Sequence, residues 1–234
     1  MAAVLFFIPA KEIETLVVSP PPMKKRRRVI EEPEKSQGHR RSGPRRTHEW
    51  ETSTSTTSRP NLVIGDLHAH DIQSFHDTKV ISFSKLTFRN LHHILESEAD
   101  ISLNHRQAVA LIIGAEDFDR GMYCTKILEN FSDTVSKIRK QNPQIFIIVC
   151  SLIHRAGDFS SSSNKIKDLN IQLQGLCKSL KVAFIQAFKP FLFRGSPIKH
   201  LYSNGGLYLN HKGAAKLTKL LQHALSPRNR EKIL

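Results

Sequence analysis

The sequence contains little cysteine and no long apolar run. Its cysteines, Cys124, Cys150 and Cys177, are odd in number and lack the spacing of a metal site, which indicates a reduced, intracellular chain. No apolar run approaches the roughly 18–20 residues of a membrane-spanning helix, so we expect no membrane partner. The apolar residues 2–8 lack a basic flank and a small-residue cleavage site and therefore make a poor signal peptide.

Several motifs of catalysis and nucleic-acid binding are also missing. There is no Gly-x-Ser-x-Gly nucleophile elbow, no phosphate-binding glycine loop and no cysteine in an activating context. Ser151 follows a predicted strand, but no activating residue lies near it in sequence. Aromatic residues make up 7% of the chain and no signature of a known RNA-binding module is present, which argues against a base-stacking platform.

Positive charge, in contrast, is abundant. Lys and Arg number 35 against 21 Asp and Glu, which gives a formal charge of +14. Residues 1–59 hold 12 basic and 7 acidic residues, and residues 60–234 hold 23 and 14. The excess favours polyanionic partners without identifying one.

Residues 1–59 are rich in Pro, Ser and Thr, and their basic residues occur in blocks. We predict a disordered tail because this segment cannot bury enough apolar surface to offset the entropy of ordering. The tail contains the basic run Lys24, Lys25, Arg26, Arg27 and Arg28. This run is typical of a nuclear-import signal or a nucleic-acid patch, and equally of a solvated linker.

After residue 60, short apolar runs alternate with helical spacing. Strands are predicted around residues 62–64, 80–81, 108–113, 145–149 and 182–185. Apolar residues recur every three or four positions within residues 88–95, 123–138, 166–180 and 214–224, and the last helix should begin after Asn210. The helical stripe over 123–138 is predicted to include Tyr123, and the serines at 160–163 are expected to form a flexible loop.

The alternation predicts an α/β fold with three layers, α/β/α. We expect a five-stranded, mostly parallel sheet of the flavodoxin-like type over residues 60–226, followed by a basic C-terminal tail at 227–234. Ligands of such folds bind at the carboxyl ends of the strands. Residues 65–66, 114–117 and 151–155 should meet there.

Histidines raise the question of a metal. Asp66 and His68 follow the first strand as in a binuclear metallophosphoesterase site, but the further ligand motif Gly-Asn-His is absent, and a strand end capped by Asp is the alternative. His76 and His70 lie near His68 in sequence, with no obvious additional ligand. The adjacent His92 and His93 belong to a predicted helix and are not expected to face one site. We expect no metal and no cofactor.

Four sequence blocks together resemble the SGNH (GDSL-type) hydrolases. They are Asn-Leu-Val-Ile-Gly-Asp-Leu-His at 61–68, Ser-Lys-Leu-Thr-Phe-Arg-Asn-Leu at 84–91, Leu-Ile-Ile-Gly-Ala-Glu-Asp at 111–117, and Gly-Gly-Leu-Tyr-Leu-Asn-His-Lys-Gly at 205–213. Their order along one α/β pattern is similar to the family's Gly-Asp-Ser, Gly, Asn and Asp-x-x-His blocks. The resemblance implies the SGNH fold for this domain.

The chain departs from that family at the catalytic positions. Leu67 stands where the family has its nucleophilic Ser, Lys85 and Glu116 replace the Gly and Asn of the oxyanion hole, and Gly205 and Tyr208 replace the Asp and His. A leucine offers no attacking atom, and tyrosine, with an ordinary pKa near 10, is a poor base at neutral pH. We therefore expect a pseudo-hydrolase without ester hydrolysis. A residual esterase using His68 or His211 as base is the alternative.

Two families with SGNH-like domains are compatible with these replacements. The OSK domain of insect Oskar proteins has this fold without the active-site residues, and resemblance to it implies RNA binding, a role in germ plasm and cytoplasmic ribonucleoprotein granules. The esterase-like domain of some LINE retrotransposon first-open-reading-frame proteins is the alternative, although it usually keeps the catalytic residues. Residues 1–59 are too few for the LOTUS domain that precedes OSK in full-length Oskar proteins.

RNA binding through phosphates would use basic residues near the former catalytic edge. The candidates are Lys79, Lys85, Arg89, Arg120, Lys199 and Lys212. The plainer interpretation is that each is a solvated residue on a helix or loop. We expect contacts led by the RNA backbone, with maternal mRNA and germ-granule proteins as the partners that the Oskar resemblance implies.

Overall fold

The structure is a computed structural model that describes residues 59–97 and 101–233. The predicted disordered tail, with the basic run at 24–28, lies outside the described residues apart from Arg59. Within the described residues, none of the helices is both long and apolar enough to cross a bilayer.

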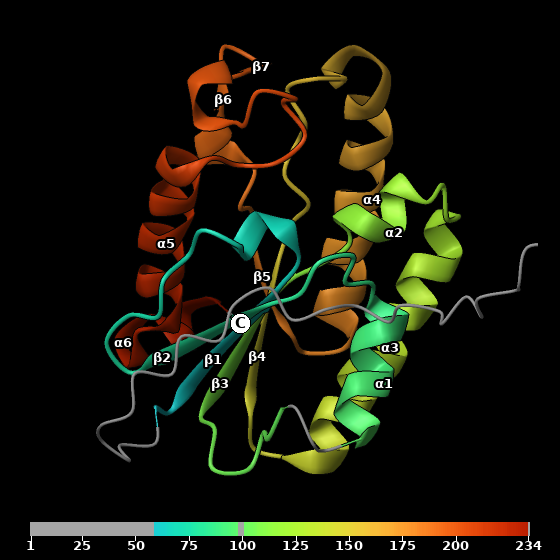
Figure 1. The fold of residues 1–234 in the computed structure, drawn as a ribbon. Coiled ribbons are helices and arrows are strands. Elements are labelled where there is room, and N and C mark those ends of the chain that lie inside the picture. Colours follow the sequence, from blue (N-terminus) through green and yellow to red (C-terminus); the bar gives the residue numbers. More distant parts are fainter. Residues whose placement is uncertain (1–58, 98–100, 234) are drawn as a thin grey trace, which may run out of the picture. The chain divides into compact units, whose positions relative to one another are not determined.

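Five strands form one parallel sheet in the order β2-β1-β3-β4-β5 (Figure 1). The strands are β1 (Asn61–Gly65), β2 (Thr78–Ser82), β3 (Ala108–Ile112), β4 (Phe146–Cys150) and β5 (Ala183–Ile185). Asn61 is in register with Thr78 on one side and Ala108 on the other, so β1 lies between β2 and β3. The five-stranded parallel sheet is as predicted, and the strand order reverses direction at β1 and β3.

Helices cover both faces of the sheet and complete the three predicted layers (Figure 1). The long ones are α1 (Phe88–Ser97), α3 (Cys124–Gln141), α4 (Phe159–Ser179) and α5 (His211–Leu225). Leu62 and Ile64 of β1 pack in a core with α1, α3 and α4, whereas Val63, one residue between them, packs in a second core with Leu217 of α5. This alternation follows the two-residue period of a strand buried on both faces.

Helix boundaries follow capping residues in the sequence. Asn210 precedes α5, and its Oδ1 accepts hydrogen bonds from the backbone N–H groups of Lys212 (2.9 Å) and Gly213 (3.1 Å). Asn142 ends α3 before a proline, and its Nδ2 donates to the carbonyl of Leu103 at 3.0 Å. Both boundaries agree with the predicted start and stop.

Two local predictions were wrong. Tyr123 is 83% exposed because it precedes the first residue of α3 and is not part of the buried stripe. The serines at 160–163 form the first turn of α4 and not a loop, since Ser162 is buried and its hydroxyl donates to Asp158 Oδ1 at 3.1 Å. The Ser run hid the helix because serine competes with helical hydrogen bonds unless a residue such as Asp158 fixes the first turn.

Several short elements were not predicted. They are α2 (Ala115–Asp119), α6 (Pro227–Ile233), the hairpin β6 (Leu192–Phe193) and β7 (Ser196–Pro197), and the 3-10 helices η1 (Leu67–Ala69), η2 (Lys189–Phe191) and η3 (Lys199–Leu201). The segment expected as a C-terminal tail forms α6, and Arg230 donates to Asn61 Oδ1 at 2.5 Å. The helix α6 is therefore attached to the beginning of β1.

Candidate functional site at the carboxyl edge

The carboxyl edge of the sheet is formed by residues 65–70, 114–120 and 151–158, which follow β1, β3 and β4. The Asp66 N–H donates to the Ile112 carbonyl at 2.9 Å, and the Phe83 N–H donates to the Gly65 carbonyl at 2.9 Å. Asp117 Oδ2 accepts from the Phe88 N–H at 3.1 Å and so caps the start of α1. These contacts hold the loops after three neighbouring strands in one arrangement.

A fourth loop, residues 203–210, lies against the loop after β4. The N–H groups of Ala156 and Gly157 donate to the Gly206 carbonyl at 2.7 and 3.1 Å. A Cβ on Gly157 would lie 2.3 Å from the Gly205 carbonyl oxygen, and one on Gly206 would lie 2.5 Å from the Gly157 nitrogen. The two backbones approach this closely only because both positions are glycine.

Residues from three of the SGNH-like blocks lie at this edge. Leu67 lies in η1, half-buried, and the ring of its neighbour His68 is 5.6 Å from the ring of Tyr208 in an edge-to-face arrangement. Burial raises the pKa of Tyr208, and the nearby carboxylates of Glu116 and Asp66 raise it further. The structure therefore brings His68, the neighbour of Leu67, and Glu116 close to Tyr208. Lys85 and Gly205 are exposed.

Asp66 and His68 are buried neighbours with opposite electrostatics. Burial raises the pKa of Asp66 to about 7, even though the backbone N–H groups of His68 and Ala115 donate to its carboxylate. Burial lowers the pKa of His68 to about 4, and the positive charge of Arg155 lowers it further. Among the described residues, neither ring nitrogen of His68 finds a hydrogen-bond partner. At neutral pH this site thus holds a neutral imidazole and a partly protonated carboxyl group.

The remaining chemistry of the edge is limited. Glu116 accepts a hydrogen bond from Arg120 Nε at 2.8 Å, so its carboxylate is paired with a cation at this edge. Ser151 is buried, and its hydroxyl accepts from the Phe188 N–H at 3.2 Å. The described residues place no hydroxyl or thiol in hydrogen-bond contact with the His68 ring. His211 is the exposed first residue of α5.

Arg155 was expected at this edge as the last residue of the segment 151–155, but its ion pairs were not predicted. It forms ion pairs with both Asp119 and Asp158, and its guanidinium lies 5.2 Å from the centre of the Phe118 ring. The pair with Asp158, three residues further on, could have been inferred from the sequence spacing. The pair with Asp119 could not, because only the fold brings these two residues together. Arg155 links α2 to the start of α4 across the top of the site.

The exposed basic candidates form two groups. Lys85 precedes α1 and Arg89 lies within it, whereas Lys199 belongs to η3 and Lys212 to the first turn of α5. The latter two elements are joined by Asn210, whose Nδ2 donates to the carbonyl of His200 at 2.9 Å. In residues 59–97 and 101–233, no ion pair involves any of these four basic side chains.

Lys85 also has an unusual backbone. Its φ of +58° lies in the left-handed region, which glycine adopts readily and lysine rarely does. The resemblance to the SGNH blocks places the family's glycine at this position, and the backbone of Lys85 has a conformation that favours glycine.

The two other basic candidates are placed differently. Arg120 is paired with Glu116. Lys79 is half-buried within β2, the edge strand of the sheet. The basic run at 24–28 lies outside the described residues.

Comparison of the fold with solved structures identifies its class. A Streptococcus pneumonia protein assigned as a platelet activating factor superimposes with a TM-score of 0.63 at 19% identity, over 74% of this chain and 86% of that one. A GDSL-like lipase from Bacteroides thetaiotaomicron gives 0.60 at 16% identity, over 78% and 93%. The OSK domain of Drosophila Oskar gives 0.51 at 14% identity, over 70% and 87%. The chain has an SGNH/GDSL hydrolase-like fold, shared by lipolytic proteins and the OSK domain.

At the level of sequence, no protein-family model and no curated protein matches the chain. The resemblance of the four blocks to the SGNH pattern nevertheless agrees with the fold that the solved structures share.

Proposed function

We propose that this chain is a non-catalytic SGNH-like protein that binds RNA through its phosphate backbone. The observation that carries the proposal is the contrast at the carboxyl edge. The positions of the family's nucleophile and base hold Leu67 and Tyr208. Four exposed basic side chains that form no ion pair within residues 59–97 and 101–233 lie at or near the starts of α1 and α5.

The absence of hydrolysis rests on the chemistry of the site residues. Ester hydrolysis of this type needs a nucleophile, a base hydrogen-bonded to it, and donors facing the oxyanion. Leu67 supplies no nucleophile, and Tyr208 holds its proton more tightly than an ordinary tyrosine. The carboxylate of Glu116 opposes a developing negative charge. His68 remains neutral but has nothing to activate.

The RNA proposal rests on charge and exposure. Residues 60–234 carry 23 basic against 14 acidic residues. Lys85, Arg89, Lys199 and Lys212 are exposed, and a phosphate chain can replace the counterions around such groups. The described surface presents few aromatic rings, so contacts to the backbone rather than base stacking should dominate.

We extend the proposal to assembly with maternal mRNA in cytoplasmic germ-plasm granules. This extension rests on the resemblance to the OSK domain, which is supported at the level of fold. The basic run at 24–28 adds nuclear import as a further possibility that the same chain carries in its sequence.

The test reverses two charges beside the carboxyl edge. In the Lys85→Glu/Arg89→Glu variant we expect affinity for a labelled single-stranded RNA to fall at least about tenfold, because two phosphate contacts become repulsive. The matched control is Lys178→Glu/Lys181→Glu, which reverses two exposed charges where α4 ends and β5 begins. Lys181 also has a positive φ, +52°, so the control matches Lys85 in backbone strain.

Fluorescence anisotropy at fixed salt gives both affinities. Equal weakening in the two variants, or none in either, would contradict the proposed surface. The same preparations should show no turnover of a short acyl ester. Turnover that disappears in His68→Ala or His211→Ala would instead support a residual esterase.

A further inference from the structure

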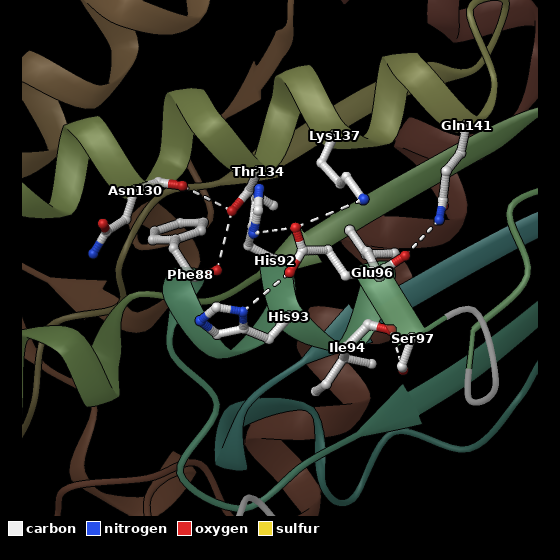
Figure 2. Close-up of polar contacts among 11 residues, drawn as sticks. Phe88, His92, His93, Ile94, Glu96, Ser97, Asn130, Thr134, Lys137 and Gln141 are labelled. Carbon is white, nitrogen blue, oxygen red and sulfur yellow. Dashed lines mark hydrogen bonds and ion pairs between the residues drawn. The ribbon is translucent and has the colours of Figure 1, made fainter.

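Three potential metal ligands converge on α1, on the side where Glu96 contacts Lys137 of α3 (Figure 2). His93 Nδ1 lies 3.2 Å from Glu96 Oε2, and His92 Nδ1 lies 3.8 Å from Glu96 Oε1. Figure 2 shows the carboxylate of Glu96 between the two imidazole rings. The expectation that adjacent histidines on a helix cannot face one site was therefore wrong.

The helical spacing explains how the three meet. Glu96 lies three residues after His93 and four after His92, so each histidine is a neighbour of the same glutamate one turn away. The two rings reach it from either side, with their centres 5.8 Å apart. All three side chains are at least 30% exposed, which leaves the site open to solvent.

We propose that His92, His93 and Glu96 bind a divalent transition-metal ion, with Zn²⁺ the best match. One donor atom of each residue lies within 4.8 Å of the other two. Ligands of a tetrahedral Zn²⁺ lie about 3.3 Å apart, given metal–ligand distances of about 2.0–2.2 Å, so small rotations of exposed side chains complete the site. Two imidazole nitrogens and one carboxylate oxygen are ligands that suit Zn²⁺, and the fourth position remains for water.

This group is distinct within the described part of the chain. Among residues 59–97 and 101–233, it alone brings three or more His, Cys, Asp or Glu donor atoms this close together. Asp66, His68, His70 and His76 form no such group there, so the metallophosphoesterase alternative lacks its ligand set. The inference does not depend on RNA binding.

The charged groups around the site determine its affinity for a metal ion. Lys137 Nζ lies 3.9 Å from Glu96 Oε1 and competes with a metal for this carboxylate. Arg89, Lys126 and Asp133 line a groove of about 330 Å³ that also touches both histidines. We therefore expect moderate affinity, which removal of the Lys137 charge should increase.

The test uses the full chain titrated with Co²⁺, whose visible absorption reports coordination, and with Zn²⁺ in competition. We expect His93→Gln and Glu96→Gln each to weaken binding of both ions at least about tenfold, since each removes one ligand. Lys137→Met should strengthen binding several-fold. Circular dichroism checks that each variant is folded.

The controls are His105→Gln and His200→Gln, which remove exposed histidines elsewhere and should leave the Co²⁺ affinity unchanged. The proposal is overturned if the wild-type chain binds no Co²⁺ at millimolar concentration. It is also overturned if His93→Gln binds within twofold of wild type, or if Lys137→Met fails to strengthen binding.

Discussion

At the scale of single residues, Asp66 and His68 show how burial at the carboxyl edge shifts the pKa of ionisable groups. Both are nearly inaccessible to solvent, with 3% exposure each. Burial disfavours the charged form of either group, so it raises the pKa of the acid and lowers that of the base. Within the part of the chain that the structure describes, neither residue forms an ion pair that would reverse this effect, and each therefore makes stability depend on pH.

The two dependences have opposite signs. Asp66 has a folded pKa of about 7 against an ordinary 3.8, so its contribution is full at low pH and is lost as pH rises through 7. His68 has a folded pKa of about 4 against 6.5, so its contribution is full above pH 6.5 and is lost as pH falls through 4. Between about pH 4 and 6.5 the two contributions oppose each other.

Single substitutions should separate these contributions. In Asp66→Asn, the free energy of unfolding should fall, relative to wild type, as pH is lowered from 6.5 to 4.5. In His68→Leu it should rise, relative to wild type, as pH is lowered from 7 to 5. Either slope can reach about 1.4 kcal/mol per pH unit for one proton. Urea denaturation followed by circular dichroism measures both, and slopes of the same sign would refute the assignment.

Residue types at the edge could be predicted, but their partners could not. The motif blocks single out Leu67, Glu116 and Tyr208, and the structure places His68, the neighbour of Leu67, against Tyr208. The ion pair of Arg155 with Asp119, and the use of Asp117 to cap α1, depend on tertiary contacts across 36 and 29 residues. No local pattern in the sequence encodes such contacts.

At the scale of elements, hydrophobic periodicity predicted the strands and long helices that pack in the core. The five strands and four long helices all bury apolar faces, and these faces leave a regular signal. No such periodic signal marks the short elements, because hydrogen bonds and not a buried apolar face shape them. These elements are the hairpin, α2, α6 and the 3-10 helices. The same limit explains the errors at Tyr123 and at 160–163, where capping and not periodicity decides the boundary.

The contact between the loops after β4 and before α5 can be tested with two adjacent glycines. Gly206→Ala should destabilise the fold by about 1–3 kcal/mol, because φ is +68° there and the new Cβ would collide with the Gly157 backbone. Gly205→Ala meets no atom within 4 Å and should change stability by less than about 0.5 kcal/mol. Thermal denaturation compares them, and equal effects would show that the close approach is not a constraint.

At the scale of the whole molecule, the main feature is the excess of basic over acidic residues. The excess is divided between residues 1–59, with 12 basic and 7 acidic residues, and residues 60–234, with 23 and 14. Binding that arises from such a distribution must respond to ionic strength, since it works by release of counterions.

RNA affinity should therefore fall steeply between 50 and 200 mM salt. If Lys85, Arg89, Lys199 and Lys212 each contact one phosphate of a single strand, the slope of log affinity against log salt is about −3 or steeper. The Lys85→Glu/Arg89→Glu variant should show a slope smaller by about 1.4. Filter binding at four salt concentrations measures both slopes. An affinity independent of salt would rule out a phosphate-led surface.

The backbone of Lys85 has one more implication. A lysine held at φ +58° strains the loop, and such conformations destabilise a fold by on the order of 1–3 kcal/mol when the residue is not glycine. Stability alone would favour glycine here. The loop thus holds a cationic side chain at a fixed point beside the carboxyl edge of the sheet, at a cost in folding stability.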